Sequence, residues 1–357
     1  MTVLFITADT VGSPTGGGLV CYQESEALRS LGLDLVTLSG KDLALERYQL
    51  PSSPFLYDYL ALDAVSRNFA DRSSKPDLVH FYSGVFTATV RCLKMLGVPV
   101  SYTNPAHSRK ETIQEFEMLC GGYPFPHVKE PHIWALYSEG YRRADLVIAP
   151  SQASAIELKA EGCKHVEVVP HGTDIPDQVP PLPDTFCAGY LGQYGPDKGL
   201  AYLFRAWGSL GYEDATLILA GDGTDELPPV ISANAGSGRF EVMGRVPQPE
   251  DLYRRISVYV QPSVTEGFGI PILEAMAHGR PVIASEGAGG AEVLTHGEDG
   301  FVVPRRDPDA IAKHLRWFKE NPEKIAQMGF NARETAKKYT WEAVRSRYVE
   351  LWQGYIR

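Results

Sequence analysis

The sequence lacks several features that mark whole classes of protein. Its five cysteines in 357 residues are odd in number, widely spaced and without a C-x-x-C pair, so neither a disulfide framework nor a zinc motif is indicated. It has no apolar run that approaches the length of a bilayer span, and the opening run 3–6 is too short for a signal peptide. We therefore expect a cytoplasmic protein with reduced thiols and at most peripheral contact with membranes.

The sequence also lacks an excess of basic residues. Asp and Glu outnumber Lys and Arg by 44 to 34, which gives a formal net charge of −10. A protein that binds along nucleic acid needs a basic face, so a nucleic-acid partner is not expected. No Asp-x-Asp metal motif lies in a suitable loop. We expect neither a divalent metal nor an organic cofactor.

What is present is a globular composition with a repeating pattern. With 44% apolar and 22% charged residues, the chain is long enough for two cores. Short apolar runs alternate with amphipathic stretches, which predicts parallel βαβ units. Four prolines fall between residues 175 and 183, a composition typical of a linker, and a second series of strands and helices follows. The predicted fold is α/β, with two doubly wound Rossmann-like domains at residues 1–180 and 181–340.

One segment carries most of the functional information. Glu266 and Glu274 are separated by seven residues that include Gly267, Gly269 and Pro271, and a helix is predicted to start between the two carboxylates. The unpaired N–H groups and the dipole of a helix start favour an anion such as a phosphate. This arrangement suits a nucleotide sugar. Alternatively, Glu266 only caps the helix and Glu274 is a solvated or ion-paired residue.

The stretch 265–284 closely resembles the E-x7-E signature of the retaining glycosyltransferases of family 4, which have the GT-B fold. Segments 145–151, 169–174 and 192–199 are also similar to stretches of that family and occur in the expected order. The resemblance implies a first domain on the acceptor side, a second domain that binds the nucleotide sugar, and a cleft between them. It further implies that the last helix, residues 341–357, packs back on the first domain.

The resemblance also assigns roles around the donor phosphates. Lys198 aligns with a lysine that neutralises the diphosphate, whereas Gln193 stands where the family usually has arginine, and Arg245 is a candidate substitute. Gly16 and Gly17 belong to a glycine-rich loop that faces the donor phosphates in the family. From the residues alone, this loop is equally well explained as a flexible connection.

Within the main motif, the resemblance implies that Glu274 holds the ribose hydroxyls and that Glu266 holds a sugar hydroxyl and opposes charge on the ring. It also implies that the residues after Glu266 bind the nucleotide-sugar donor through their backbone N–H groups, namely Phe268, Gly269 and Ile270. A histidine after the strand 98–103 contacts the transferred sugar in the family, and His107 is placed to do so. The catalytic candidates are therefore Glu266, Lys198 and His107.

The sequence thus predicts a retaining, metal-independent hexosyltransferase that uses a UDP- or GDP-sugar. Its acceptor is not identified and is a glycan, a lipid-linked sugar or a small molecule. Two alternatives stay open: a sugar-nucleotide epimerase or phosphorolytic enzyme on the same fold, and a catalytically silent subunit that binds nucleotide sugars. The silent subunit is suggested by Gln193 in place of arginine.

Overall fold

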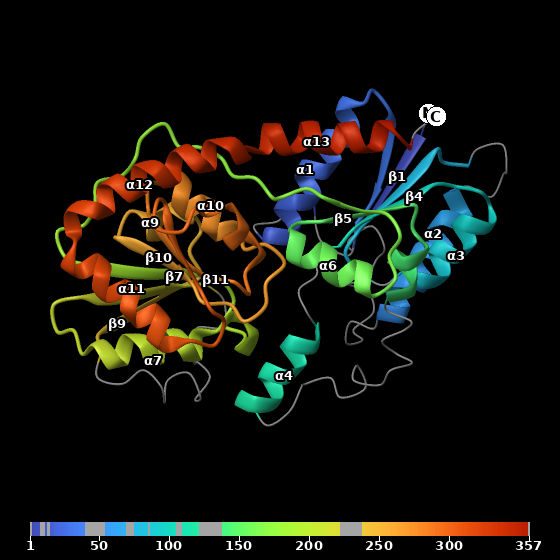
Figure 1. The fold of residues 1–357 in the computed structure, drawn as a ribbon. Coiled ribbons are helices and arrows are strands. Elements are labelled where there is room, and N and C mark those ends of the chain that lie inside the picture. Colours follow the sequence, from blue (N-terminus) through green and yellow to red (C-terminus); the bar gives the residue numbers. More distant parts are fainter. Residues whose placement is uncertain are drawn as a thin grey trace. The chain divides into compact units, whose positions relative to one another are not determined.

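The computed structural model describes residues 2–7, 11–12, 15–39, 54–68, 75–84, 86–104, 109–120, 138–221 and 238–355. The chain forms two compact units (Figure 1). Unit 1 comprises residues 1–106, 125–171 and 341–357, and unit 2 comprises residues 107–124 and 172–340. The longer part of unit 2 starts at Gly172, whereas the sequence pattern placed the domain boundary at residue 181, and the unit also includes a short segment from the first half of the sequence.

Unit 1 is built on a six-stranded parallel sheet of order β2-β1-β3-β4-β5-β6. Nearly all strand residues are buried except along the two edge strands, as expected for a parallel sheet covered on both faces. The order reverses direction between β1 and β3, which pair from Val3 opposite Leu78 to Thr7 opposite Tyr82. The strands are β1 (Thr2–Thr7), β2 (Asp34–Leu38), β3 (Leu78–Tyr82), β4 (Val100–Thr103), β5 (Leu146–Ala149) and β6 (Val166–Val168).

Among the described residues, unit 1 contains α1 (Gly16–Ser30), α2 (Pro54–Asn68), α3 (Thr87–Met95), α6 (Gln152–Ala160) and α13 (Trp341–Gln353), and residues 138–143 are helical as well. The last helix, α13, packs on α1, as Figure 1 shows. Trp352 is fully buried, and its ring meets that of His80 edge to face with 4.9 Å between the ring centroids. Arg345 donates to Gln23 at 2.5 Å. The expectation that the C-terminal helix returns to the first half of the chain is confirmed.

Unit 2 contains a second six-stranded parallel sheet, of order β12-β11-β10-β7-β8-β9. Counted within this unit, the order is the 3-2-1-4-5-6 arrangement of doubly wound nucleotide-binding folds. Its direction reverses between β7 and β10, which are hydrogen-bonded neighbours in the centre of the sheet. The strands are β7 (Cys187–Leu191), β8 (Thr216–Ala220), β9 (Phe240–Gly244), β10 (Val258–Gln261), β11 (Val282–Ser285) and β12 (Gly300–Val303).

The α-helices of unit 2 are α4 (Arg109–Cys120), α7 (Leu200–Leu210), α9 (Glu250–Tyr253), α10 (Ile270–Ala277), α11 (Pro308–Glu320) and α12 (Pro322–Ala336). The described part of unit 2 also contains the short 3-10 turns η4 (Pro196–Lys198), η5 (Gly289–Val293) and η6 (Lys337–Tyr339). The sequence pattern predicted two doubly wound α/β halves, and this fold class is confirmed. It did not predict α2, α4 or β6. In the part of the chain that the structure describes, no helix is long and apolar enough to cross a membrane.

Candidate functional site

The two principal motifs meet where the strand order of unit 2 reverses. Lys198 lies in η4, after β7, and Glu266 lies in the loop after the neighbouring strand β10. The Lys198 ammonium nitrogen is 2.5 Å from Glu266 Oε2, although the residues are 68 positions apart. Ligands of doubly wound sheets bind at the carboxyl ends of the strands at this kind of reversal. The topology therefore brings a cation and a carboxylate together at the expected ligand position.

Backbone contacts fix the two loops against each other. The carbonyl of Asp197 accepts hydrogen bonds from the N–H groups of Val264 at 2.8 Å and Thr265 at 3.4 Å. Gly199 has a φ of 73°, and a Cβ atom there would lie only 2.0 Å from the carbonyl oxygen of Pro262. Only glycine fits this left-handed position and this close approach of two backbones. The Lys198–Glu266 contact thus rests on backbone packing rather than on a flexible loop.

Lys198 is more enclosed than its glycine-rich surroundings indicate. Its side chain is only 14% exposed, and Asp197 Oδ2 lies 3.4 Å from the ammonium in addition to Glu266. Burial alone lowers the pKa of Lys198, but the adjacent carboxylates of Glu266 and Asp197 more than offset this effect, and the net pKa is raised. The side chain is therefore a permanent, preoriented cation.

The helix predicted after Glu266 begins at Ile270. Gly269 occupies the N-cap position with a φ of 88°, and no side chain caps this helix. The backbone of Glu266 instead pairs with the segment after β11: its N–H donates to Gly287 and its carbonyl accepts from Gly289, both at 2.9 Å. Glu266 is thus not the helix cap. In the first turn, the N–H of Ile272 donates to the carbonyl of Gly269 at 2.9 Å, and Pro271 has no N–H. The N–H groups of Gly269 and Ile270 precede the first of the hydrogen bonds within the helix.

Glu274 is the fifth residue of α10, so it lies just over one turn into the helix rather than the predicted two turns. It is partly buried and accepts a hydrogen bond from the Tyr253 hydroxyl at 2.9 Å. Burial raises the pKa of Glu274 to about 7; the Tyr253 hydrogen bond lowers it, and Asp174 raises it further. The residue is not the solvated helix carboxylate that was the alternative interpretation.

The other predicted donor residues are distributed as follows. Phe268 and Ile270 are buried next to Gly269. Gln193 is exposed, and its carbonyl accepts a hydrogen bond from Tyr190 at 2.8 Å. Arg245 is exposed and directly follows β9. It lies at the same edge of the sheet as the end of β8, since the N–H of Gly221, which follows β8, donates to the carbonyl of Gly244 at 2.9 Å.

Three further candidates were predicted. Gly16 and Gly17 form the first residues of α1 in unit 1, where the side chain of Thr15 caps the helix by accepting from Gly18 at 3.1 Å. His107 lies outside the described residues.

Two residues near the motifs were missed by the sequence interpretation. Asp197 contributes both the carbonyl that anchors the β10 loop and a carboxylate beside Lys198. Its position next to the lysine was a signal that could have identified it. Tyr253 reaches Glu274 from α9, and nothing in the local sequence marks it. Its burial and its hydrogen bond are visible only in the folded chain.

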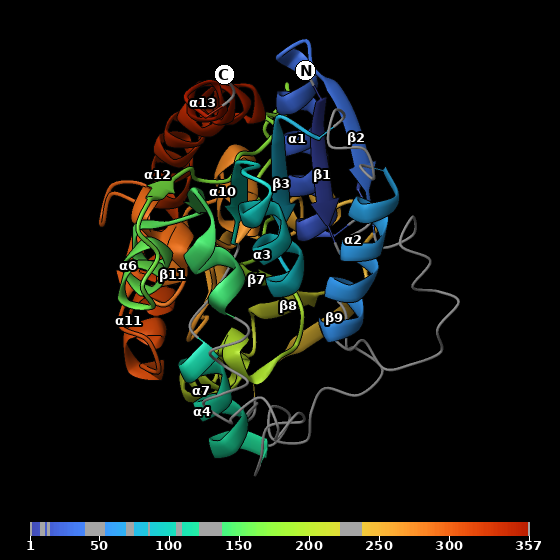
Figure 2. The same ribbon diagram turned by 90° about the vertical axis from the view of Figure 1, so that its right-hand side faces the viewer.

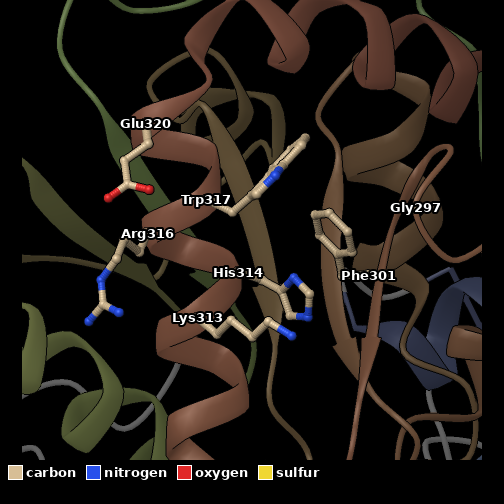
Figure 3. Close-up of a pocket in the computed structure, with 7 residues that line it drawn as sticks. All are labelled: Gly297, Phe301, Lys313, His314, Arg316, Trp317 and Glu320. Carbon is tan, nitrogen blue, oxygen red and sulfur yellow. The ribbon is translucent and has the colours of Figure 1, made fainter.

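Unit 2 also has a surface pocket away from these motifs. It has a volume of about 440 Å³ and is lined by residues of α11 and the segment around β12, including Phe301, His314 and Trp317 (Figure 3). Gly297, on its rim, precedes β12 and so lies toward the amino ends of the strands. The rings of Phe301 and His314 stack on each other at 4.0 Å. None of the predicted site residues lines this pocket. The faces of the Phe301 and His314 rings in it are already partly covered, because the two rings stack on each other.

Among the described residues, no group of three or more His, Cys, Asp and Glu is arranged to hold a metal ion. Two carboxylates, those of Asp197 and Glu266, lie beside Lys198, and the single ammonium offsets one of their two negative charges. The chemistry that this site offers is a fixed cation, a carboxylate in contact with it, a helix start and a second carboxylate one turn along that helix.

Comparison with known proteins assigns the family. Residues 14–176 match the model described as Glycosyltransferase Family 4, and residues 185–321 match the model described as Glycosyl transferases group 1. The chain belongs to the GT-B glycosyltransferases. The two matches fall on the two sheets in turn, so the family assignment does not depend on the E-x7-E segment alone.

Individual relatives agree with this assignment. The lipopolysaccharide core biosynthesis mannosyltransferase LpcC of Rhizobium leguminosarum bv. viciae is 32% identical over 54% of this chain and 59% of its own length. The chain spans 47–59% of the length of the first curated relatives that it matches.

Two solved structures share the fold. Sucrose-phosphate synthase from Thermosynechococcus elongatus has a TM-score of 0.79 at 19% identity, over 99% of this chain and 98% of its own. Anabaena HepE in complex with UDP has a TM-score of 0.74 at 20% identity, over 99% and 100%. At these identities the similarity shows the GT-B fold and no more.

Proposed function

We propose that the chain is a retaining glycosyltransferase that moves a hexose from a UDP- or GDP-sugar to an acceptor hydroxyl. The observation that carries the proposal is the contact of Lys198 with Glu266 at the strand-order reversal of unit 2, beside the start of α10. A cation and a helix start favour the diphosphate, and the flanking carboxylates favour hydroxyl groups. The UDP in the HepE structure of the same fold supports a nucleoside diphosphate ligand.

In the proposed reaction, the bond between the anomeric carbon and the diphosphate breaks, and the electron pair leaves with the nucleoside diphosphate. Lys198 stabilises the negative charge that develops on this leaving group. Glu266, now in contact with the lysine, binds a sugar hydroxyl and opposes the positive charge on the ring. The carboxylate of Glu274 accepts hydrogen bonds from the ribose hydroxyls.

Retention follows from attack on the same face. The acceptor oxygen bonds to the anomeric carbon on the face that the diphosphate leaves, and the acceptor proton passes to an oxygen of the departing phosphate. A double displacement needs a second carboxylate as a nucleophile. Asp197 is the other carboxylate beside Lys198, and its side chain is only 9% exposed. This burial supports the route that uses the leaving phosphate as the base, with no metal ion.

The first test is binding. We expect nucleoside diphosphate, measured by calorimetric titration, to bind the wild-type chain and to bind Lys198→Met at least tenfold more weakly, a difference of about 1.4 kcal/mol. The matched control is Lys319→Met, because Lys319 also pairs with a carboxylate, Asp214, at 2.7 Å but lies in the last turn of α11, which contains none of the predicted site residues. Equal loss in both variants, or in neither, would remove Lys198 from the site.

The second test separates transfer from the alternatives. A transferase releases free nucleoside diphosphate from the identified donor when an acceptor is supplied, and the product keeps the donor's anomeric configuration. An epimerase changes the sugar without acceptor, a phosphorolytic enzyme needs phosphate, and a silent subunit releases nothing. An inverted product would contradict the same-face reaction.

Kinetics separate the two glutamates. Glu266→Gln keeps the size and most hydrogen bonding but removes the charge that opposes the ring cation, so it should lower kcat more than it raises the donor KM. Glu274→Ala removes a contact made equally before and during reaction, so it should mainly raise the donor KM. Unchanged kinetics in both folded variants would leave the motif without a catalytic role.

A further inference from the structure

A helix from the first half of the sequence is part of the donor-side unit. The helix α4 follows β4 of unit 1 in sequence, yet it belongs to unit 2 and packs on η4, the turn that carries Lys198. Figure 2 shows α4 beside α7. The sequence interpretation assigned no element to this segment. A helix docked on the phosphate-binding turn is positioned to affect what that turn binds.

Arg306 makes the polar contacts that hold α4. Its guanidinium donates through NH2 to Glu111 Oε2 at 2.6 Å and through Nε to Glu115. These two glutamates are one helical turn apart on α4, so the single planar guanidinium bridges both. Glu115 is completely buried, and its other oxygen accepts from the Tyr202 hydroxyl at 3.2 Å. We call these four residues the α4 clamp.

Electrostatics and backbone conformation show that the α4 clamp is a specific arrangement. Burial lowers the pKa of Arg306, but its hydrogen bonds to Glu111 and Glu115 outweigh this effect and raise the pKa. Burial and the nearby Glu115 raise the pKa of Tyr202 to about 12. Arg306 adopts a φ of 60°, a left-handed conformation that costs free energy for any residue but glycine. The clamp holds Arg306 in this conformation.

The α4 clamp is connected to the phosphate-binding turn on two sides. Tyr202 lies in the first turn of α7, four residues after Lys198, and its N–H donates to the carbonyl of Gly199 at 3.0 Å. On the other side, α4 itself packs on η4. Displacement of α4 therefore removes packing from the turn and the partner of Tyr202 at the same time.

We propose that Arg306 is a positioning residue for the donor site: by clamping α4 against η4, it keeps Lys198 in the orientation that binds the donor diphosphate. This inference rests on the proposed function. The residue contacts no substrate in this role, and its effect is transmitted through α4 and the first turn of α7. Because coupling is reciprocal, nucleoside diphosphate binding must in turn favour the docked position of α4.

Binding measurements test this inference on the full chain, with UDP and GDP as probes. We expect Arg306→Gln to raise the Kd of the nucleoside diphosphate about tenfold, which corresponds to about 1.4 kcal/mol. The Kd of Arg306→Lys should fall between those of Arg306→Gln and the wild type, because an ammonium keeps the charge but does not form the planar bridge. The matched control is Arg305→Gln, since the neighbouring Arg305 has only a 3.7 Å contact with the exposed Glu286.

A second variant and a second measurement guard against a trivial loss of folding. Glu111→Gln removes the charge of one contact and leaves the buried Glu115 paired, so it should remain folded with a twofold to fivefold weaker Kd. In hydrogen exchange, nucleoside diphosphate should increase the protection of residues 109–120 in the wild type and have a smaller effect in Arg306→Gln. A purely structural arginine would not produce this ligand-dependent protection.

The outcomes are distinguishable. If the wild type binds UDP or GDP and folded Arg306→Gln and Glu111→Gln bind it with the same Kd, the positioning role is overturned and the proposed function stands. Protection of α4 that does not respond to the nucleotide also overturns the role. If the wild type binds no nucleoside diphosphate of any base, the proposed function fails and the positioning role fails with it.

Discussion

Replacement of Glu274 by glutamine should change how the stability of the protein depends on pH. In the folded chain the pKa of this carboxyl is about 7, chiefly because of burial, against an ordinary value of 4.5. Glutamine represents the uncharged form at every pH and can still accept the hydrogen bond from Tyr253, which the wild type makes at 2.9 Å. The variant therefore isolates the free energy of keeping a charge at position 274.

The sign follows from proton linkage. Because the folded pKa is above the unfolded one, the folded chain binds this proton more tightly. The resulting stability is fully present below about pH 4.5 and is lost as the pH rises through about 7. A displacement from 4.5 to about 7 corresponds to roughly 3 kcal/mol at about 1.36 kcal/mol per pH unit. Glu274→Gln should therefore be more stable than the wild type above pH 7.5 and differ little from it near pH 5.

Thermal melting at pH 5 and pH 8 measures this difference. A domain of this size shifts by roughly 2–4 °C per kcal/mol, so we expect the Tm of Glu274→Gln to exceed that of the wild type by about 6 °C at pH 8. The matched control is Glu323→Gln, at an exposed position in the first turn of α12. The Tm difference between this variant and the wild type should not increase from pH 5 to pH 8. A Tm difference that is equal at both pH values would refute the assignment of a raised pKa to Glu274.

Three further predictions concern the surroundings of the site. Gly199→Ala should leave little folded protein, as judged by circular dichroism, because residue 199 has a left-handed conformation and its Cβ would lie 2.0 Å from the carbonyl oxygen of Pro262. A fully stable variant would show that the two loops are not packed as described. Arg280→Met should lower the free energy of unfolding, measured by urea titration, by roughly 3 kcal/mol, because the buried guanidinium donates to the carbonyls of Tyr253, Pro180 and Pro181. A loss below about 1 kcal/mol would contradict a stabilising role of these hydrogen bonds. Dialysis against a chelator should leave transfer intact, because Lys198 takes the place of a metal; lost activity that magnesium or manganese restores would count against that role.

Much of the fold was readable from local sequence because the signals were local. Alternating apolar and amphipathic runs predicted parallel βαβ units in both halves of the chain, and both halves contain a parallel sheet. Glycine and proline around Gly269 and Pro271 correctly placed the start of α10. Such cues depend on backbone preferences that act within a few residues.

Other features were not readable for the same reason. The helix α4 carries no clear apolar stripe in its sequence, and its place in unit 2 depends on ion pairs with Arg306, 191 and 195 positions away. Tyr253 was not identified because its value to Glu274 arises from the packing of α9 beside α10. The environment that raises the pKa of Glu274 to about 7 is likewise a product of burial, which the sequence around a glutamate does not report.

The sequence by itself determined which groups are available: two carboxylates with seven residues between them, a helix start between the two, and a lysine directly before a glycine. Only the tertiary structure decided that Lys198 and Glu266 touch, because that contact depends on β10 lying next to β7 after the chain has passed through β8 and β9. Strand order is set by the packing of all the helices and strands together. The distance between two residues 68 positions apart is therefore a property of the whole sheet rather than of either segment.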